Sequence, residues 1–350
     1  MAYSTINKST DYFNSKTYTG NTPGQSITGI GFKPDLSWFK GRVGNGYDHS
    51  LRDSLRGTLK HISSNNNTAE TDAANSLLSF DTDGFTLGTD NRSFVNENNT
   101  PHIAWNWLAG TTGSGNTQGS GTYKAYSYSV NTVSGISIIK YKGNGTSGHQ
   151  IPHHLGVSPS MTIIKKLSGD DNWIVQSESR GWNKRLILDT TNAEATHTDF
   201  VSAVSSTTLS LYTNGSVNGN DADYIAYVFA EKTGYSKFGT YLNSNNNVAG
   251  PFIYTGFAPK FLILRNCDVT EHWVMHDNLR PGYNGNGSYI YPNLNNAEIT
   301  NNTDHTVDLL SNGFKVRSSN DQWNDTGEPF FFMAFGQSLV GSNNVPCTAR

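Results

Sequence analysis

Histidine and aspartate residues occur in this sequence at spacings that could bind a metal ion. His149, His153 and His154 lie within six residues, as zinc ligands often do. No cysteine lies near them, however, and adjacent histidines on a strand point to opposite faces of a sheet. The segment 81–84, Asp-Thr-Asp-Gly, resembles the start of a calcium loop but lacks the later acidic ligands and the terminal glutamate. We expect packed histidines and a turn, and we predict no metal and no cofactor.

A glycine pattern at residues 143–148 matches the dinucleotide-binding motif G-x-G-x-x-G. The motif functions when it opens a helix whose N-terminus faces a pyrophosphate. Here it joins the predicted strand Ile136–Tyr141 to another extended segment, in a chain that has 35 glycines among 350 residues. We therefore interpret residues 143–148 as a loop.

A glutamate recurs in an Ala-Glu dipeptide, at Glu70, Glu194 and Glu298. Glycoside hydrolysis requires two carboxylates that face one cleft, and no second acid accompanies all three glutamates. A single recurring acid fits a cap or a loop hydrogen bond better. Neither a nucleophile elbow nor a Cys–His pair is present. We predict no catalytic residue and no enzyme activity.

The aromatic residues divide into two groups. One group lies on apolar strand segments and is predicted to pack in the core: Trp38, Trp105, Trp173 and Trp273. The other lies in polar stretches rich in Gly and Asn: Tyr47, Trp182, Tyr283 and Trp323. Flat rings stack on the apolar faces of sugars, so this second group contains the candidates for carbohydrate or partner contact. The alternative for them is half-buried packing between tandem domains.

These residues belong to a unit that occurs three times. Each copy opens on Gly-x-x-Pro and an apolar run, continues through an arginine and the Ala-Glu dipeptide, and closes on a strand in which alanine precedes an aromatic residue. The openings begin at Gly31, Gly156 and Gly256; the apolar runs end at Lys40, Lys165 and Arg265; the arginines are Arg56, Arg180 and Arg280; the closing pairs are Ala104-Trp105, Ala226-Tyr227 and Ala334-Phe335.

Short alternating segments, with turn signals roughly every 8–12 residues, predict antiparallel β-sandwiches. Asp83-Gly84 and Asn312-Gly313 are strong hairpin signals. The sequence therefore predicts an all-β chain of three tandem sandwiches. The predicted boundaries are 1–110 for the first repeat, 111–121 for a flexible Gly/Ser/Thr linker, 122–233 and 234–340 for the second and third repeats, and 341–350 for a C-terminal tail.

Composition excludes several classes of partner. The chain carries 25 Lys and Arg against 28 Asp and Glu, for a net charge of −3, and it has no basic stripe that could bind nucleic acid. No apolar run is long enough to insert into a membrane. The N-terminus lacks the apolar core of a signal peptide. The two cysteines, Cys267 and Cys347, are expected to be reduced thiols in a protein made in a cytosol.

Four phrases in the first copy resemble a repeat family of tail-fibre and other virion proteins of marine tailed bacteriophages. They are the segments 31–40, 53–57, 83–88 and 104–107. The two ends of the chain, 2–7 and 340–346, are also similar to that family, and the likeness is weakest in the second copy. The resemblance implies concanavalin-A-like, lectin-type (or jelly-roll) sandwiches. It supplies no catalytic residue and no sugar site.

The resemblance implies a virion structural protein, either a tail fibre or a fibre-associated piece, with a lectin-like module that contributes to host-surface attachment. The alternatives are a non-receptor decoration or connector protein of capsid or tail, and a polysaccharide depolymerase. The expected partners are other virion proteins and a bacterial surface glycan, in a homo-oligomer for which a trimer is favoured. The expected location is the virion surface, after assembly in the host cytoplasm.

Overall fold

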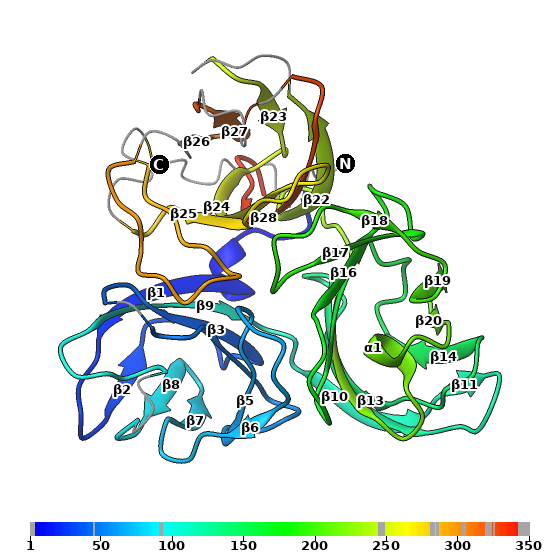
Figure 1. Ribbon diagram of the computed structural model, residues 1–350. Coiled ribbons are helices and arrows are strands. Elements are labelled where there is room, and N and C mark those ends of the chain that lie inside the picture. The colour runs from blue at the N-terminus through cyan, green and yellow to red at the C-terminus, as the bar shows by residue number, and fades with distance from the viewer. Residues whose placement is uncertain are drawn as a thin grey trace.

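The computed structural model describes residues 4–44, 46–90, 94–243, 249–280, 284, 287–302, 306–318, 324 and 326–341. These residues form antiparallel β-sheets, and their helical elements are the 3-10 turn η1 (Ser9–Asp11) and the helix α1 (Gly215–Asn218). The predicted all-β fold is therefore confirmed. The strands form three lobes, which follow one another from blue through green to red in Figure 1, and each lobe has an inner and an outer sheet.

The first lobe contains residues 13–107. Its inner sheet has the order β1-β9-β3-β4 and its outer sheet the order β2-β8-β7, with a separate ribbon β5-β6. The strands are β1 (Phe13–Thr19), β2 (Gln25–Thr28), β3 (Leu36–Gly41), β4 (Ser50–Asp53), β5 (Lys60–His61), β6 (Thr71–Asp72), β7 (Leu77–Asp81), β8 (Gly84–Leu87) and β9 (Pro101–Trp107).

The second lobe contains residues 111–229 and is the largest. Its inner sheet has the order β10-β12-β13-β21-β15-β16-β17-β18 and its outer sheet the order β11-β14-β20-β19. The strands are β10 (Thr111–Asn116), β11 (Gln118–Gly119), β12 (Ala125–Asn131), β13 (Ile136–Lys142), β14 (His149–Pro152), β15 (Met161–Lys166), β16 (Ile174–Ser177), β17 (Lys184–Ile187), β18 (Ala195–Thr196), β19 (Val201–Val204), β20 (Thr208–Leu211) and β21 (Asp223–Phe229).

The third lobe contains residues 236–337. Its inner sheet has the order β22-β28-β24-β25 and its outer sheet the order β23-β27-β26. The strands are β22 (Ser236–Leu242), β23 (Phe252–Tyr254), β24 (Ala258–Asn266), β25 (Val274–Asp277), β26 (Val307–Leu310), β27 (Gly313–Val316) and β28 (Pro329–Gln337). Four inner strands of each lobe are arranged alike, in the orders β1-β9-β3-β4, β13-β21-β15-β16 and β22-β28-β24-β25, so that the last strand of each lobe lies second.

The segment predicted as a flexible linker, 111–121, is instead β-structure. β10 pairs with β12, and β11 pairs with β14, so this segment extends both sheets of the second lobe. Its glycines have a packing reason: the side chains of Tyr128 and Tyr126 lie across Gly113 and Gly115 on the neighbouring strand, where a Cβ would approach the Tyr128 hydroxyl to 2.6 Å and the Tyr126 ring to 3.1 Å. Composition alone could not distinguish this strand from a linker.

The additional strands β10 and β12 of the second lobe affect which residue type is suitable on the adjacent strand β13. Lys16 on β1 and Lys237 on β22 lie on edge strands, two positions apart in register, opposite Ala104 and Ala334. Inward-pointing lysines protect sheet edges from pairing with other chains. In the second lobe the residue that matches Lys16 is Ile139, which is fully buried because β12 pairs with its strand and leaves no edge there.

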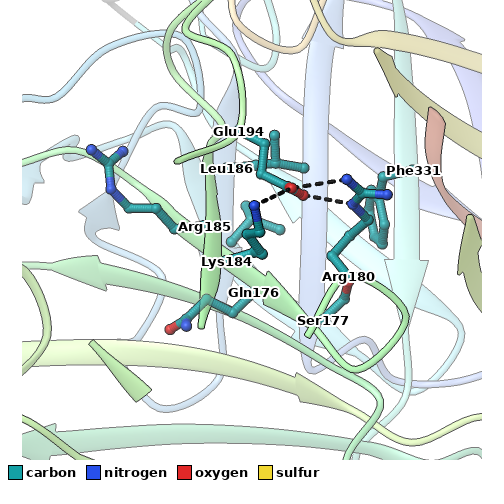
Figure 2. Close-up of a pocket in the computed structure, with 9 residues that line it drawn as sticks. Gln176, Ser177, Arg180, Lys184, Arg185, Leu186, Glu194 and Phe331 are labelled. Atoms are coloured by element: carbon teal, nitrogen blue, oxygen red, sulfur yellow. Dashed lines mark hydrogen bonds and ion pairs between the residues drawn. The ribbon is translucent and has the colours of Figure 1, made fainter. Parts of the chain in front are cut away.

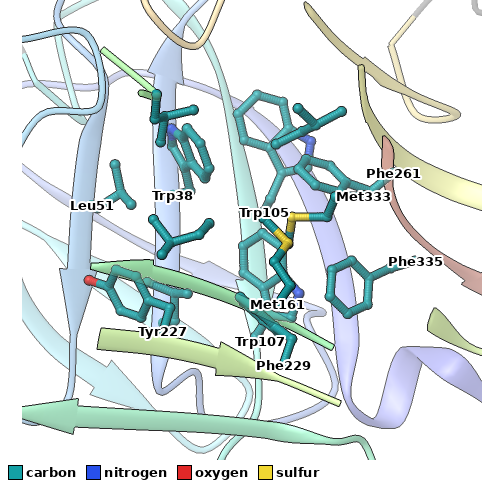
Figure 3. Packing of buried hydrophobic residues seen from close by; sticks show 14 of the residues in the cluster. Trp38, Leu51, Trp105, Trp107, Met161, Tyr227, Phe229, Phe261, Met333 and Phe335 are labelled. Carbon is teal, nitrogen blue, oxygen red and sulfur yellow. The ribbon is translucent and has the colours of Figure 1, made fainter. Parts of the chain in front are cut away.

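The inner sheets are buried on both faces. On each last strand one set of alternate side chains faces the outer sheet of its own lobe, and the other set faces a central core shared by all three lobes. Ala104, for example, packs within the first lobe, whereas Trp105 packs in the central core (Figure 3). The four tryptophans predicted to be core residues are at most 3% exposed. The central core therefore joins the lobes into one body.

Two further expectations about local structure are met. Asp81 pairs with Gly84, and Leu310 with Gly313, so both predicted hairpin turns are present. The glycine-rich segment 143–148 is the loop between β13 and β14. Among the described residues, no helix has the length and apolar character needed to cross a membrane.

We predict that one lobe does not fold alone. A fragment of residues 110–233, which keeps β10 and β11, would expose the central face of its inner sheet to water, whereas the full chain should unfold in one cooperative transition. Circular dichroism and calorimetry of both proteins test this. A fragment with a cooperative thermal transition, or a full chain that unfolds in three steps, would contradict the prediction.

Candidate functional site

The recurring glutamate pairs with the recurring arginine in every lobe. Arg180 Nε and Nη2 donate to the Glu194 carboxylate at 2.6 and 2.8 Å. Arg280 Nη1 lies 3.1 Å from Glu298 Oε1, and the corresponding pair in the first lobe, Arg56 and Glu70, is 3.4 Å apart. The pairs are largely buried, which strengthens their attraction. The recurring acid thus has a structural partner.

An aspartate joins this pair in two lobes and connects it to the next lobe. Asp53 accepts from Arg56 and, at 2.9 Å, from the hydroxyl of Tyr227 in the second lobe. Burial, reinforced by the Asp53 carboxylate, raises the pKa of Tyr227 well above its usual value. In the same way Asp277 accepts from Trp105 Nε1 of the first lobe at 3.2 Å. These bonds place buried polar contacts directly between lobes.

The matching positions of the third seam, the contact between the second and third lobes, carry Ser177 and Met333. Met333 has no hydrogen-bond donor to satisfy, and the aspartate is absent from the position that would accept one. The pair of positions has therefore changed together. Because no aspartate is present there, Glu194 is the one carboxylate among the described residues that accepts hydrogen bonds from Arg180.

At each seam a side-chain ring nitrogen forms a hydrogen bond to the neighbouring lobe. The residue that carries it directly precedes β4, β16 or β25. Trp173 Nε1 donates to the Ser63 carbonyl and Trp273 Nε1 to the Ile187 carbonyl, both at 2.8 Å. His49 occupies the matching position in the first lobe, and its Nε2 lies 3.0 Å from the Tyr291 carbonyl. Burial lowers the pKa of His49 well below its usual value, so the ring is neutral and donates through Nε2.

The basic residue that ends each apolar run is buried and also crosses a seam. Lys40 Nζ donates to the Asn295 carbonyl at 3.1 Å, and Lys165 Nζ to the Asn67 carbonyl at 3.1 Å. Arg265 donates to the Thr191 carbonyl at 2.7 Å. Each accepting residue lies three positions before the recurring glutamate.

The cations satisfy carbonyls outside the sheets, which would be costly to bury unpaired. Burial lowers the pKa of both lysines to about 8 and that of Arg265 to about 10. They remain protonated at neutral pH and donate several hydrogen bonds each.

A backbone bond completes each seam in the opposite direction. The Glu70 N–H donates to the Leu167 carbonyl at 3.0 Å, Glu194 to Cys267 at 2.6 Å, and Glu298 to Arg42 at 2.9 Å. Each lobe therefore donates side-chain bonds to one neighbour and receives them from the other. The three seams close a cycle.

One residue of this network is an acid where its counterparts are amides. Asn65 and Asn293 accept the backbone N–H of His49 and Trp273, and Asp189 accepts that of Trp173 at 2.9 Å. Burial raises the pKa of Asp189 to about 6, against the opposing effect of the Trp173 N–H. This carboxylate is therefore ionised in a poorly solvated place at neutral pH.

The two predicted contact aromatics that the structure describes, Tyr47 and Trp182, lie in different lobes. The Tyr47 ring lies half-buried against Gly41 and Gly44, and its carbonyl accepts from Lys40. Trp182 is half-buried against the core of the second lobe, not between lobes, and its carbonyl accepts from Gln176 at 2.7 Å. Tyr283 and Trp323 lie outside the described residues.

The metal-like clusters serve packing and turns. His149 bonds Asn218 and Thr117, and His153 bonds the Ser205 carbonyl. His154 stacks on Tyr128 at 3.7 Å between ring centroids. The Asp83 carboxylate accepts two backbone N–H groups near its turn, those of Gly29 and Gly31. The residues that the structure describes contain no group of three or more metal-ligating side chains.

Cys267 is a buried free thiol at the central core. Burial raises its pKa to about 12, which keeps it protonated and unreactive. Cys347 and the predicted tail beyond Gly341 lie outside the described residues.

Two spaces between described residues bear on ligand binding. One is beside the Arg180–Glu194 pair, where Lys184 also contacts the carboxylate and Arg185 points away (Figure 2). It has no room for a water molecule. The other, of about 10 Å³, is enclosed by apolar residues of the central core. Neither offers the concave site of hundreds of cubic ångströms that small ligands require.

The sequence contained signals that its interpretation missed. A lysine or arginine at the same place in three apolar runs indicates a buried cation. A tryptophan also occupies the same place in two of the repeats, at Trp173 and Trp273. Both signals concern contacts between lobes. A pattern within one repeat does not specify such partners.

The chain belongs to the family described as a domain of unknown function (DUF7483), which matches residues 8–338. That single match spans all three lobes, in agreement with the shared central core. No curated protein and no solved structure matches the chain.

We predict that Trp273→Phe destabilises the protein by about 1–3 kcal/mol, because it leaves the buried Ile187 carbonyl without its donor. Thermal and denaturant unfolding measure the loss. Trp182→Phe is the matched control, since that ring is half-buried and makes no seam bond, and it should cost less. An equal loss of unfolding free energy in both variants would show that the seam hydrogen bond does not contribute specifically to stability.

We predict that Asp189→Asn stabilises the protein at neutral pH and not at pH 5. The folded pKa of about 6 lies above the ordinary value of 3.8, so the folded state binds the proton more tightly and stability from this group falls as pH rises through 6. Asparagine keeps the acceptor for Trp173 and removes the charge. The gain should be on the order of 1–3 kcal/mol at pH 7.5.

The difference in melting temperature between wild type and Asp189→Asn, measured at pH 5, 6 and 7.5, isolates this residue from other titrating groups. It should grow with pH. A difference that stays constant across the series would show that Asp189 does not titrate near 6.

Proposed function

We propose that this member of the family is a structural protein of a bacteriophage virion, a tail-fibre or fibre-associated module that contributes to attachment to the host surface. The sequence resemblance to marine phage virion proteins supports the assignment to a particle. The closed cycle of three seams is the observation that carries the structural role, because it makes a rigid frame whose outer loops can vary without loss of the fold.

The proposed activity is binding without turnover. A depolymerase would need two carboxylates free to act in one cleft. The recurring glutamates instead pair with arginines at the seams, and the space beside the Arg180–Glu194 pair is too small for a saccharide. These observations support a non-enzymatic protein.

A decoration or connector protein is the second candidate. The placement of Tyr47 and Trp182 favours it, because both rings are half-buried in packing and are not displayed at open loops. Three seams of one design also give the chain a shape suited to a threefold position on a particle. In this alternative the outer surface contacts other virion proteins only.

The proposal places the protein at the virion surface after assembly in the host cytoplasm. Its partners would be other virion proteins and a bacterial surface glycan. Self-association, with a trimer favoured, would multiply weak contacts into firm attachment.

Mass spectrometry of purified particles and competition of phage adsorption by the purified protein test this function. We expect the protein in every particle at several copies, and we expect the purified protein to reduce adsorption in a saturable manner. Presence without competition would favour the connector. Absence from particles would overturn both candidates.

A further inference from the structure

Two aromatic rings are displayed on the outer sheet of the third lobe. Phe252 is 46% exposed and Tyr254 53% exposed, and Ile253 between them is buried. Alternate residues of a strand share one face, so both rings lie on the solvent face of β23. Their positions along the strand differ by about 6.6 Å. The pair covers a short, continuous stretch of that face.

A glycine leaves the surface beside these rings flat. Gly313 is opposite Tyr254 on β27, and a Cβ there would come within 2.9 Å of the Phe252 ring. The Phe252 ring thus leans over bare backbone. The result is a platform with no side chain rising from Gly313, which we define as the β23 platform: Phe252, Tyr254 and Gly313.

The fold does not require aromatic residues at these positions. The matching residues of the first lobe, Ser26 and Thr28, are exposed and polar, and Ser26 lies 2.9 Å from Thr86. In the second lobe the matching residues are Gln150 and Pro152. The rings of the third lobe are therefore an addition to a frame that is stable without them.

Cations surround the platform in a chain whose net charge is negative. Lys237 Nζ lies 5.8 Å from the centroid of the Tyr254 ring. Lys315 is directly opposite Phe252. Arg317 follows β27 two positions after Lys315, and its Nε lies 2.6 Å from the carboxylate of Asp308. Asp308 is the one acidic residue among these described neighbours. The local charge favours an anionic ligand.

We propose that the β23 platform binds an acidic saccharide, a pyranose chain that carries carboxylate or sulfate groups. The apolar face of a sugar ring stacks on Phe252 and Tyr254, and the anionic substituents face Lys237 and Lys315. Two half-exposed rings on one short strand offer far less area than a stable protein interface of roughly 1,600 Å². The platform therefore suits a carbohydrate better than a folded partner. This inference rests on the attachment role proposed above and names its ligand class.

The test is calorimetric titration of the full chain with oligogalacturonate, and with a neutral maltooligosaccharide of the same length. Dextran sulfate against dextran distinguishes sulfate from carboxylate as the anion. The variants Phe252→Ser and Tyr254→Thr install the residues of the first lobe, which the frame already accepts. We expect each to weaken binding of the acidic saccharide about tenfold or more. Lys315→Gln should weaken it less and should reduce its dependence on salt.

Tyr123→Thr is the matched control, because Tyr123 is 60% exposed but lies in the second lobe. It should bind like wild type, and all variants should keep the wild-type melting temperature. The inference is overturned if no acidic saccharide binds, if neutral chains bind equally well, or if Phe252→Ser and Tyr254→Thr leave binding intact. It is likewise overturned if these variants block incorporation into particles but bind saccharide normally, which would identify a protein partner.

Failure here is separate from failure of the proposed function. Detection in particles and competition of adsorption use the wild-type chain and do not depend on the platform. A particle protein that competes for adsorption without binding an acidic saccharide would retain the proposed function and reject this ligand.

Discussion

Each inner sheet of this protein must bury two faces, and the rest of the structure depends on that constraint. One face packs on the outer sheet of its own lobe, as in any sandwich. The other face carries large residues such as Trp105, Tyr227 and Phe335, which no single lobe can cover. Three such faces enclose one core when the lobes close on one another. The lobes are thus parts of a single hydrophobic body, and the single family match over residues 8–338 follows the same limits.

Enclosing that core brings irregular backbone into the seams, and buried carbonyls there need donors. The chain meets this need at matching places with different chemistry: His49 where the other lobes have tryptophan, and Arg265 where they have lysine. All three seams have a hydrogen-bond donor at each of these places, and each donor points to the same neighbouring lobe in the cycle. Asp53 and Asp277 accept a hydrogen bond from a hydroxyl or an indole of the next lobe. Ser177 occupies the matching position in the second lobe, and the matching residue of its neighbour is the apolar Met333. The seams therefore differ in both members of a donor–acceptor pair at once. Replacing only one member would leave a buried polar group without a partner.

The sequence predicted the elements well because they depend on local patterns. The all-β class, both glycine hairpins and the burial of the four strand tryptophans follow from periodicity and turn chemistry. The linker prediction failed because Gly113 and Gly115 are selected by rings on a neighbouring strand, which composition does not contain. The seam contacts join residues such as Trp173 and Ser63, more than one hundred positions apart. Nothing within one repeat specifies such a pair. The aromatic candidates at Tyr47 and Trp182 were chosen by their polar surroundings in sequence, whereas exposure of the ring depends on what packs above it.

The three lobes are alike inside and different outside. The interior repeats the same strand order and the same direction of side-chain donation across the seams, which together close the shared core. The outer surfaces are not under that constraint. The second lobe covers its sheet edges with β10, β11 and β12, the first keeps polar residues on β2, and the third displays Phe252 and Tyr254. A frame that holds three surfaces rigidly while leaving each free to change suits a protein whose ligands vary. On the attachment role proposed above, the residues that distinguish one lobe from another on these outer surfaces are the ones expected to contact a ligand.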